Sequence, residues 1–230
     1  MIVALNNKSN LTKYEFEKYL GELNDIETNH LMILCPSMIN VPLYYDSKIK
    51  LGAQNVSCYL KGAHTGEVFA EQLTSFGVEY CIVGHSERRQ DQKESDEEIH
   101  EKIQRLFEAG ITPILCCGET KEEREEGVEK EVIARELDIA LNGVSEEDKA
   151  RVIIAYEPIW SIGTGLIPTN EQVIDIIEYI KSKYYNKVLY GGSANEKNID
   201  ELKKCTCIDG YLLGGLSLKP ENLNIFVNKL

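Results

Sequence analysis

The chain has 230 residues, of which 43% are hydrophobic and 27% charged, and these proportions are typical of one globular domain with a sizeable core. A formal net charge of −13 argues against general affinity for nucleic acid or anionic membranes, so an anionic ligand would need a local positive site. No apolar run reaches membrane-spanning length and no basic, signal-like region opens the chain, so we expect a cytoplasmic protein whose residues 1–230 form a single domain.

Short apolar segments rich in β-branched residues recur along the chain, and longer amphipathic stretches separate them. This alternation predicts an α/β fold with a parallel sheet and helical crossovers. The eight predicted strands lie near 2–5, 31–35, 50–53, 80–83, 112–116, 152–155, 187–190 and 210–213. Eight such units suit a closed barrel, but periodicity alone leaves an open sheet of the same content as an alternative.

Helical periodicity is clearest in three of the intervening stretches. Within 95–109, apolar residues from Ile99 to Phe107 recur at spacings of three and four, which is the pattern of an amphipathic helix. Residues 120–141 and 171–184 follow the same pattern. The sequence therefore predicts helices in these three stretches.

Seven cysteines are spread along the chain. Their odd number and the lack of paired Cys-x-x-Cys spacing argue against a disulfide framework and a zinc site. We expect Cys35, Cys81 and Cys116, at the edges of apolar runs, to pack as small buried hydrophobic residues. Cys205 and Cys207 are close in sequence, but without a neighbouring histidine or carboxylate cluster they predict no metal site.

The most informative stretch runs from residue 155 to residue 165 and reads Ala-Tyr-Glu-Pro-Ile-Trp-Ser-Ile-Gly-Thr-Gly. Pro158 fixes its own φ and disfavours helical geometry at Glu157, so the preceding strand ends with a carboxylate. The glycines allow the following loop to bend, and closure of a loop over a carboxylate favours proton transfer. Taken alone, a Glu-Pro pair is more often a strand-ending cap.

Five segments along most of the chain resemble the triosephosphate isomerase family, in the order and at roughly the spacing of that family. Each short glycine motif is weak evidence alone, but the five together make the resemblance specific. It implies a single-domain (β/α)8 TIM barrel, which decides between the closed barrel and the open sheet. The segments are Asn6-Asn7-Lys8, Gly84 to Arg89 (GHSERR), the 155–165 stretch, Tyr190-Gly191-Gly192-Ser193, and Gly214 to Pro220 (GGLSLKP).

The resemblance implies an isomerase that interconverts dihydroxyacetone phosphate and D-glyceraldehyde 3-phosphate through an enediolate. Glu157 is then the base that removes and returns a carbon-bound proton, and His85 is a neutral electrophile that polarises the carbonyl. Lys8 holds the negative charge of the substrate, and Asn6 orients Lys8 and the substrate. No metal or organic cofactor is expected, because protein groups supply both base and electrophile. A lone histidine at a strand end is more often a structural hydrogen-bonding residue.

The resemblance also implies a phosphate cradle, since backbone N–H groups attract phosphate whatever the net charge of the protein. The residues expected to bind the substrate are Asn6, Lys8, Gly163, Ser193, Gly214 and Gly215. The supporting residues are Glu87, which positions Lys8, Ser86 after the histidine, Tyr190, and the apolar pair Ile162 and Leu212, which crowds Glu157 after loop closure.

Residues 62–67, Gly-Ala-His-Thr-Gly-Glu, resemble the protruding third loop of the family. The resemblance implies a homodimer in which Thr65, Gly66 and Glu67 lie at the interface and the threonine enters the neighbouring subunit. An ordinary polar surface loop is the alternative.

Three features depart from the family pattern. Asn7 stands where the family usually has tryptophan, so the packing behind Lys8 is expected to differ. The short distance between Lys8 and the second strand indicates shortened helices in the first one or two units. Pro168 stands where the family has alanine and lacks the N–H that would bind the Tyr190 hydroxyl in the closed loop, so we expect closure to be less favoured.

Two other functions remain as alternatives. A different phosphosugar isomerase or an aldolase on the same barrel would not need His85, Glu157 and Lys8 together, and an aldolase would want a lysine inside a central strand. A phosphate-binding protein without turnover would gain little from a desolvated carboxylate beside an anion, so Glu157 argues against it.

Overall fold

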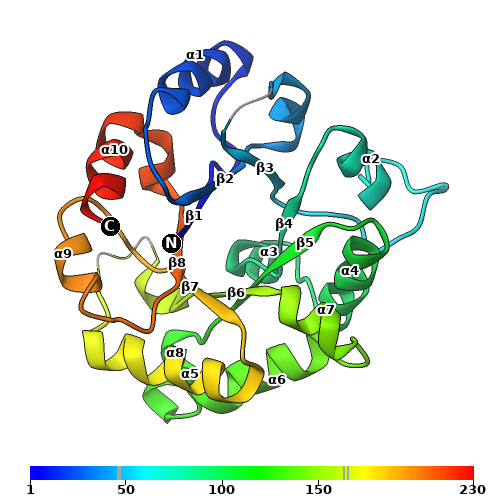
Figure 1. Cartoon of the computed structure of the whole chain (residues 1–230). Helices are drawn as coiled ribbons and strands as arrows, with labels where there is room; N and C mark the ends of the chain where they lie inside the picture. Colours follow the sequence, from blue (N-terminus) through cyan, green and yellow to red (C-terminus); the bar gives the residue numbers. More distant parts are fainter. Residues whose placement is uncertain (46–47, 163, 165) are drawn as a thin grey trace.

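The computed structural model describes residues 1–45, 48–162, 164 and 166–230, and its strands close into a barrel surrounded by helices (Figure 1). Each strand pairs in parallel with the next along the chain, and the last pairs with the first. This closure confirms the predicted (β/α)8 barrel and rules out the open sheet. The strands are β1 Ile2–Asn6, β2 Leu31–Cys35, β3 Lys50–Ala53, β4 Tyr80–Val83, β5 Thr112–Cys117, β6 Ile153–Tyr156, β7 Lys187–Tyr190 and β8 Gly210–Leu213.

The strands lie within one residue of the predicted positions. The largest change is in β6, which leaves out Val152 and includes Tyr156. Val152 donates its N–H to the carbonyl of Lys149 and so ends the preceding helix, whereas Tyr156 pairs with Cys117 in the ladder. The ladder therefore stops directly before Glu157.

Helices and short 3-10 turns connect the strands and cover the outside of the barrel (Figure 1). The predicted helices at 95–109 and 171–184 are confirmed as α4 and α8. The elements are α1 Lys13–Asn24, η1 Met38–Leu43, α2 Ala70–Ser75, α3 Ser86–Asp91, α4 Asp96–Glu108, α5 Lys121–Glu126, α6 Glu129–Ala140, α7 Glu146–Arg151, η2 Ile159–Ser161, α8 Asn170–Tyr184, α9 Ile199–Leu202, η3 Gly215–Leu218 and α10 Pro220–Lys229.

The single helix predicted over 120–141 is wrong, because the stretch forms two helices, α5 and α6. Gly127 ends α5 with a φ of 75°, in the left-handed region that glycine adopts without a side-chain clash. Its N–H binds the carbonyl of Arg124, which closes the last turn. A new helix then begins at Glu129.

The shortened helices expected in the first one or two units, relative to the family, stay a prediction. Helix α1 has 12 residues, and its first turn is held by bonds from the N–H and hydroxyl of Thr12 to the Glu15 carboxylate. Between β2 and β3, the described residues form only the 3-10 turn η1. Within the described chain, no helix is both long and apolar enough to cross a membrane.

Two apolar layers form the core. Alternate residues of each strand point into the barrel or outward against the helices, as the pleat of a strand requires. Cys35 and Cys116 pack inside the barrel and Cys81 packs outside it, each with no exposed surface. The prediction that these three thiols behave as buried hydrophobic residues is confirmed.

Candidate active site

Most of the residues predicted from the sequence line one cavity at the C-terminal ends of the barrel strands. Its volume is about 460 Å³. Gly163, predicted to bind phosphate, lies outside the residues that the structure describes. The predicted residues that line the cavity are Asn6, Lys8, His85, Glu157, Ile162, Ser193, Leu212, Gly214 and Gly215.

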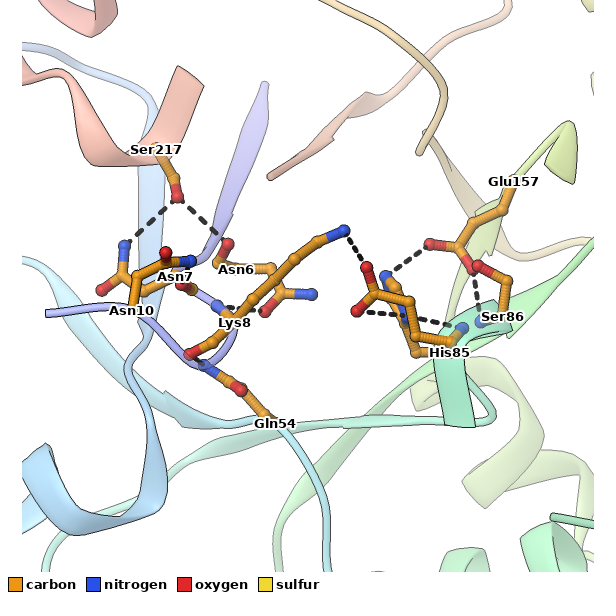
Figure 2. Close-up of polar contacts among 10 residues, drawn as sticks. Asn6, Asn7, Lys8, Asn10, Gln54, His85, Ser86, Glu157 and Ser217 are labelled. Atoms are coloured by element: carbon orange, nitrogen blue, oxygen red, sulfur yellow. Dashed lines mark hydrogen bonds and ion pairs between the residues drawn. The ribbon is translucent and has the colours of Figure 1, made fainter. Parts of the chain in front are cut away.

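The end of β1 carries Asn6 and holds Lys8 in an unusual backbone conformation. Lys8 has a φ of 51°, in the left-handed region that residues other than glycine rarely adopt. The Asn6 side-chain oxygen accepts the Lys8 N–H at 3.0 Å, and the Gln54 amide donates to the Lys8 carbonyl at 2.9 Å (Figure 2). Bonds on both sides of Lys8 therefore stabilise a conformation that is unfavourable alone.

The side chain of Lys8 crosses the mouth of the cavity. Its ammonium group lies 2.5 Å from a carboxylate oxygen of Glu87, which comes from α3. A side chain at Gly214 would place its first carbon 3.2 Å from the last methylene of Lys8, so the glycine leaves room for the lysine beside β8. Because the ion pair is partly exposed, its main effect is on the position of the cation rather than on stability.

Asn7 lies behind Lys8 and is buried. Its amide donates to the hydroxyl of Tyr19 at 3.3 Å and to that of Ser217 at 3.2 Å. The Ser217 hydroxyl in turn donates to the Asn6 carbonyl at 3.1 Å (Figure 2). The site is thus supported here by a hydrogen-bond network that joins β1, α1 and η3.

The side chains of His85 and Glu157 lie next to each other and point toward each other (Figure 2). The Nε2 atom of His85 is 3.1 Å from Oε1 of Glu157, and the side chains are 8% and 2% exposed. The Glu87 N–H donates to Nδ1 of His85 at 3.2 Å. An Nδ1 atom that accepts a hydrogen bond carries no proton, so the neutral ring carries its proton on Nε2, directed at Glu157.

The Glu157 carboxylate is held on both oxygens. While Oε1 faces His85, Oε2 accepts the Ser86 N–H at 3.0 Å. The Glu157 N–H donates to the Cys117 carbonyl at 2.8 Å. A side chain at Gly191 would lie 2.9 Å from Cγ of Glu157, so this glycine provides the space in which the carboxylate sits.

Ser193, Gly214 and Gly215 lie together on one wall of the cavity, after β7 and β8. The Ser193 hydroxyl donates to the Ser161 carbonyl at 3.0 Å, which links this wall to the loop after Glu157. The Ser193 carbonyl accepts the side-chain amide of Asn198 at 2.8 Å. The wall therefore presents backbone groups on a braced turn.

Sequence reasoning missed two lysines on the same wall, Lys197 and Lys219. The pKa of the neighbouring Glu196 is lowered mainly by the hydrogen bond to its own backbone N–H, and Asn222 and these two lysines add smaller effects in the same direction. Together with Lys8 the two lysines give the cavity the local positive charge that a protein of net charge −13 needs for an anion. Lys219 lies within the quoted GGLSLKP segment, so its position was a signal that went unused.

Glu119 is a third residue that the sequence did not single out. It is fully buried, and its Oε1 accepts the indole N–H of Trp160 at 2.7 Å and the hydroxyl of Tyr156 at 3.1 Å. Burial raises its pKa, and the bonds from Trp160 and Tyr156 oppose that rise. Glu119 thus anchors the start of the loop, while Leu166 and Ile167 near its other end are 50% and 57% exposed.

Pro168 is buried at the end of the same loop. Among the described residues, the hydroxyl of Tyr190 makes no hydrogen bond of standard geometry, although Ser161 interacts with it, and proline has no N–H to offer it. The effect of Pro168 on closure stays a prediction.

On its other side the site opens toward the loop between β3 and α2. Asn6, Lys8 and His85 also line a second cavity of about 740 Å³, together with Gly66 and Glu67. Thr65, like these two residues, is exposed. Elsewhere in this loop, the rings of Tyr59 and His64 stack at 4.1 Å.

No group of three or more His, Cys, Asp or Glu side chains suited to a metal ion occurs in the part of the chain that the structure describes. The chemistry available in the cavity is that of a carboxylate, a neutral imidazole, lysine cations and backbone N–H groups. This set can move a proton next to a carbonyl group while holding an anion.

Comparison with known proteins gives a consistent result. A family model described as triosephosphate isomerase matches residues 1–230. A triosephosphate isomerase of Aquifex aeolicus (strain VF5) is 42% identical over 239 residues, which cover 96% of this chain and 96% of the relative. One of Clostridium tetani (strain Massachusetts / E88) is 40% identical over 243 residues, 99% of this chain and 95% of the relative. A triosephosphate isomerase of Clostridium botulinum (strain Loch Maree / Type A3) is 38% identical over 243 residues, which cover 99% of this chain and 98% of the relative.

Proposed function

The chain belongs to the triosephosphate isomerase family and is an aldose-ketose isomerase, and from that premise we propose that it interconverts dihydroxyacetone phosphate and D-glyceraldehyde 3-phosphate through an enediolate. Glu157 is the base and His85 the electrophile. The observation that carries this assignment is the 3.1 Å contact between His85 Nε2 and Glu157 Oε1 in a cavity that also holds Lys8.

The resting contacts of Glu157 suggest how the substrate engages it. Both carboxylate oxygens accept N–H groups, one from His85 and one from Ser86. When a substrate carbonyl oxygen accepts the hydrogen bond from Nε2 of His85, Oε1 of Glu157 loses that bond. The carboxylate is then available to remove the proton from the carbon next to the carbonyl. Because Glu157 is 2% exposed, little water screens it from the charge that develops.

His85 acts as a neutral donor. Its Nδ1 is occupied by the Glu87 N–H, so the ring has one proton to offer, on Nε2. That proton polarises the carbonyl and then passes between the two oxygens of the enediolate. Lys8, 2.5 Å from Glu87, supplies the positive charge that stabilises the developing oxyanion, and Asn6 fixes the Lys8 backbone.

The phosphate is bound by backbone N–H groups of Ser193, Gly214 and Gly215, with Gly163 joining from the loop after closure. Binding of this unreactive group drives closure of the loop, which excludes water that would otherwise favour loss of phosphate from the enediolate. The half-exposed Leu166 supports this, because closure would bury apolar surface of the loop.

We also propose a homodimer. The 740 Å³ cavity beside Lys8 and His85 offers a space for a loop of a neighbouring subunit, and the exposed Thr65 is the residue expected to enter it. Light scattering at micromolar concentration tests this, and a monomeric mass would remove the dimer. The cytoplasmic location expected from the sequence stays a prediction.

The assignment is tested by following conversion of D-glyceraldehyde 3-phosphate in an assay coupled to glycerol-phosphate dehydrogenase. Glu157→Asp withdraws the carboxylate by about one bond, and we expect kcat to fall roughly 10²- to 10³-fold. Glu131→Asp, at an exposed position on α6, is the matched control and should keep full activity. A folded wild-type protein that binds inorganic phosphate without turnover would instead indicate a phosphate-binding barrel.

A further inference from the structure

A buried ion pair lies behind the ends of β4 and β5, and the mechanism above does not use it. Arg89 of α3 and Glu136 of α6 have side chains that are 14% and 6% exposed, and Arg89 Nη1 lies 3.6 Å from a Glu136 oxygen. Neither side chain is among the described residues that line the catalytic cavity. Burying two charges is unfavourable unless hydrogen bonds and ion pairs compensate for the lost hydration, and both side chains make such contacts.

Glu136 holds the peptide unit that holds Glu157. Its Oε2 accepts the Gly118 N–H at 3.0 Å. The carbonyl of the same peptide unit belongs to Cys117 and accepts the Glu157 N–H at 2.8 Å. Because a peptide unit is planar and its N–H and carbonyl point in opposite directions, the orientation of one fixes that of the other. The Glu136 carboxylate therefore sets the direction of the bond to the Glu157 backbone.

The backbones of Gly118 and Glu157 are packed too closely for one to move without the other. A side chain at Gly118 would place its first carbon 1.7 Å from the Glu157 carbonyl oxygen. The two backbones thus touch directly, with no side chain between them. A shift of the peptide before Gly118 is therefore transmitted to Glu157.

Arg89 makes the corresponding contact on the side of His85. Its Nε donates to the Gly84 carbonyl at 2.8 Å, and this carbonyl belongs to the peptide that leads into His85. Its Nη2 donates to the Cys116 carbonyl at 3.4 Å, and Nη1 pairs with Asp96. One guanidinium group therefore bridges the ends of β4 and β5.

We propose that Glu136 and Arg89 are positioning residues, which act through the peptides before His85 and Gly118 to set the separation of His85 from Glu157. The catalytic roles of His85 and Glu157 in this proposal rest on the proposed function. The contacts of Glu136 and Arg89 are observed in the structure and do not depend on that function. Glu136 is the more informative residue to change, because its reach and its charge can be altered separately.

Two substitutions separate the hydrogen bond from the ion pair. Glu136→Asp keeps the charge opposite Arg89 but withdraws the acceptor from the Gly118 N–H by about 1.5 Å, the length of one carbon–carbon bond. Glu136→Gln keeps the reach and an acceptor oxygen but removes the charge. Asp138→Asn is the control, since Asp138 lies on the same helix and pairs with Lys183 away from the cavity.

We expect Glu136→Asp to lower kcat about 10-fold or more, because small misplacements of reacting groups are costly, with KM and inhibition by inorganic phosphate changed less than about twofold. Glu136→Gln and Asp138→Asn should keep kcat within about threefold of wild type. Amide hydrogen exchange at Gly118 in the unliganded protein should be faster in Glu136→Asp only.

The proposal is overturned if Glu136→Asp keeps wild-type kcat, or if Glu136→Gln loses as much kcat as Glu136→Asp, since the charge would then be the important property. Parallel loss of kcat and phosphate affinity in Glu136→Asp would also overturn it, because that pattern reports general disruption. An inactive wild-type protein would refute the proposed function instead, and the exchange rate at Gly118 would still test the contact.

Discussion

Gly191→Ala is a minimal perturbation of the catalytic base. An alanine side chain there would place its carbon 2.9 Å from Cγ of Glu157 and 3.2 Å from the Tyr156 carbonyl oxygen. Comfortable carbon–carbon contacts begin at about 3.5 Å, so the Glu157 side chain has to move by roughly 0.6 Å. Gly191 is not among the glycines with positive φ, so alanine introduces no backbone strain of its own.

The size of the expected effect follows from that displacement. Misplacement by about 1 Å costs up to about 100-fold in rate, so we expect kcat of Gly191→Ala to fall about 10- to 100-fold. The measurement is steady-state kinetics in the coupled isomerase assay, with thermal unfolding recorded in parallel. The loss should fall on kcat, because the altered contact is with the base.

Gly21→Ala is the matched control. Gly21 lies inside α1, and a side chain there would meet no atom within 4 Å. Alanine should leave kcat unchanged and stabilise the helix by up to about 1 kcal/mol. Wild-type kcat in a folded Gly191→Ala protein would show that the space beside Glu157 is not limiting, which would refute the reasoning.

Three further predictions concern stability and loop closure. Burial raises the pKa of Glu136 to about 7, against the opposing effects of Arg89 and a backbone N–H, so the folded state binds the extra proton and wild-type stability falls as pH rises from about 4.5 through 7. In denaturant unfolding, the free energy of unfolding of Glu136→Gln should therefore rise relative to that of wild type by up to about 3 kcal/mol between pH 5 and pH 8. A difference between the two proteins that does not change with pH would contradict this. Asn7→Ala should cost about 1–3 kcal/mol of unfolding free energy in urea, because it removes two buried hydrogen bonds, to the hydroxyls of Tyr19 and Ser217, and a change below about 0.5 kcal/mol would count against that network. Pro168→Ala restores a backbone N–H and should raise the closed-loop population in relaxation-dispersion measurements, but only while the Tyr190 hydroxyl is present, so an equal rise in the Tyr190→Phe background would refute the predicted bond.

The strands and their ends could be predicted because each buried strand is a short apolar run with a clear stop. Pro158 marks one such stop, and the observed ladder indeed ends at Tyr156. Parallel strands that close into a barrel bring their C-terminal ends together, so residues far apart in sequence, such as Lys8 and His85, were expected in one place and line one cavity.

What the sequence did not reveal depends on how helices rotate and where they break. Residues 120–127 contain no apolar residue, so the apolar spacing of this stretch begins only at Val128, and Gly127 was a helix-end signal that the sequence reading did not use. The contact between Glu136 and Gly118 depends on which side of α6 faces β5, and a buried carboxylate looks like a surface one in a run of charged residues. Lys197 reaches the cavity through a turn that no pattern predicted.

Two hydrogen bonds join the beginning of the chain to its end. Asn7 and Ser217 are separated by 210 positions in the sequence, and Asn6 and Ser217 by 211. During synthesis, β1 therefore cannot pair with β8 until nearly the whole chain has been made. Until β8 is complete, the free sides of β1 and β7 have no strand beside them, and such edges invite pairing with other chains. Contacts between distant residues also slow the final step of folding. A chain cut short before β8 would therefore carry the base, the electrophile and Ser193, but it would lack Gly214, Gly215 and the Ser217 hydroxyl that binds the Asn6 carbonyl.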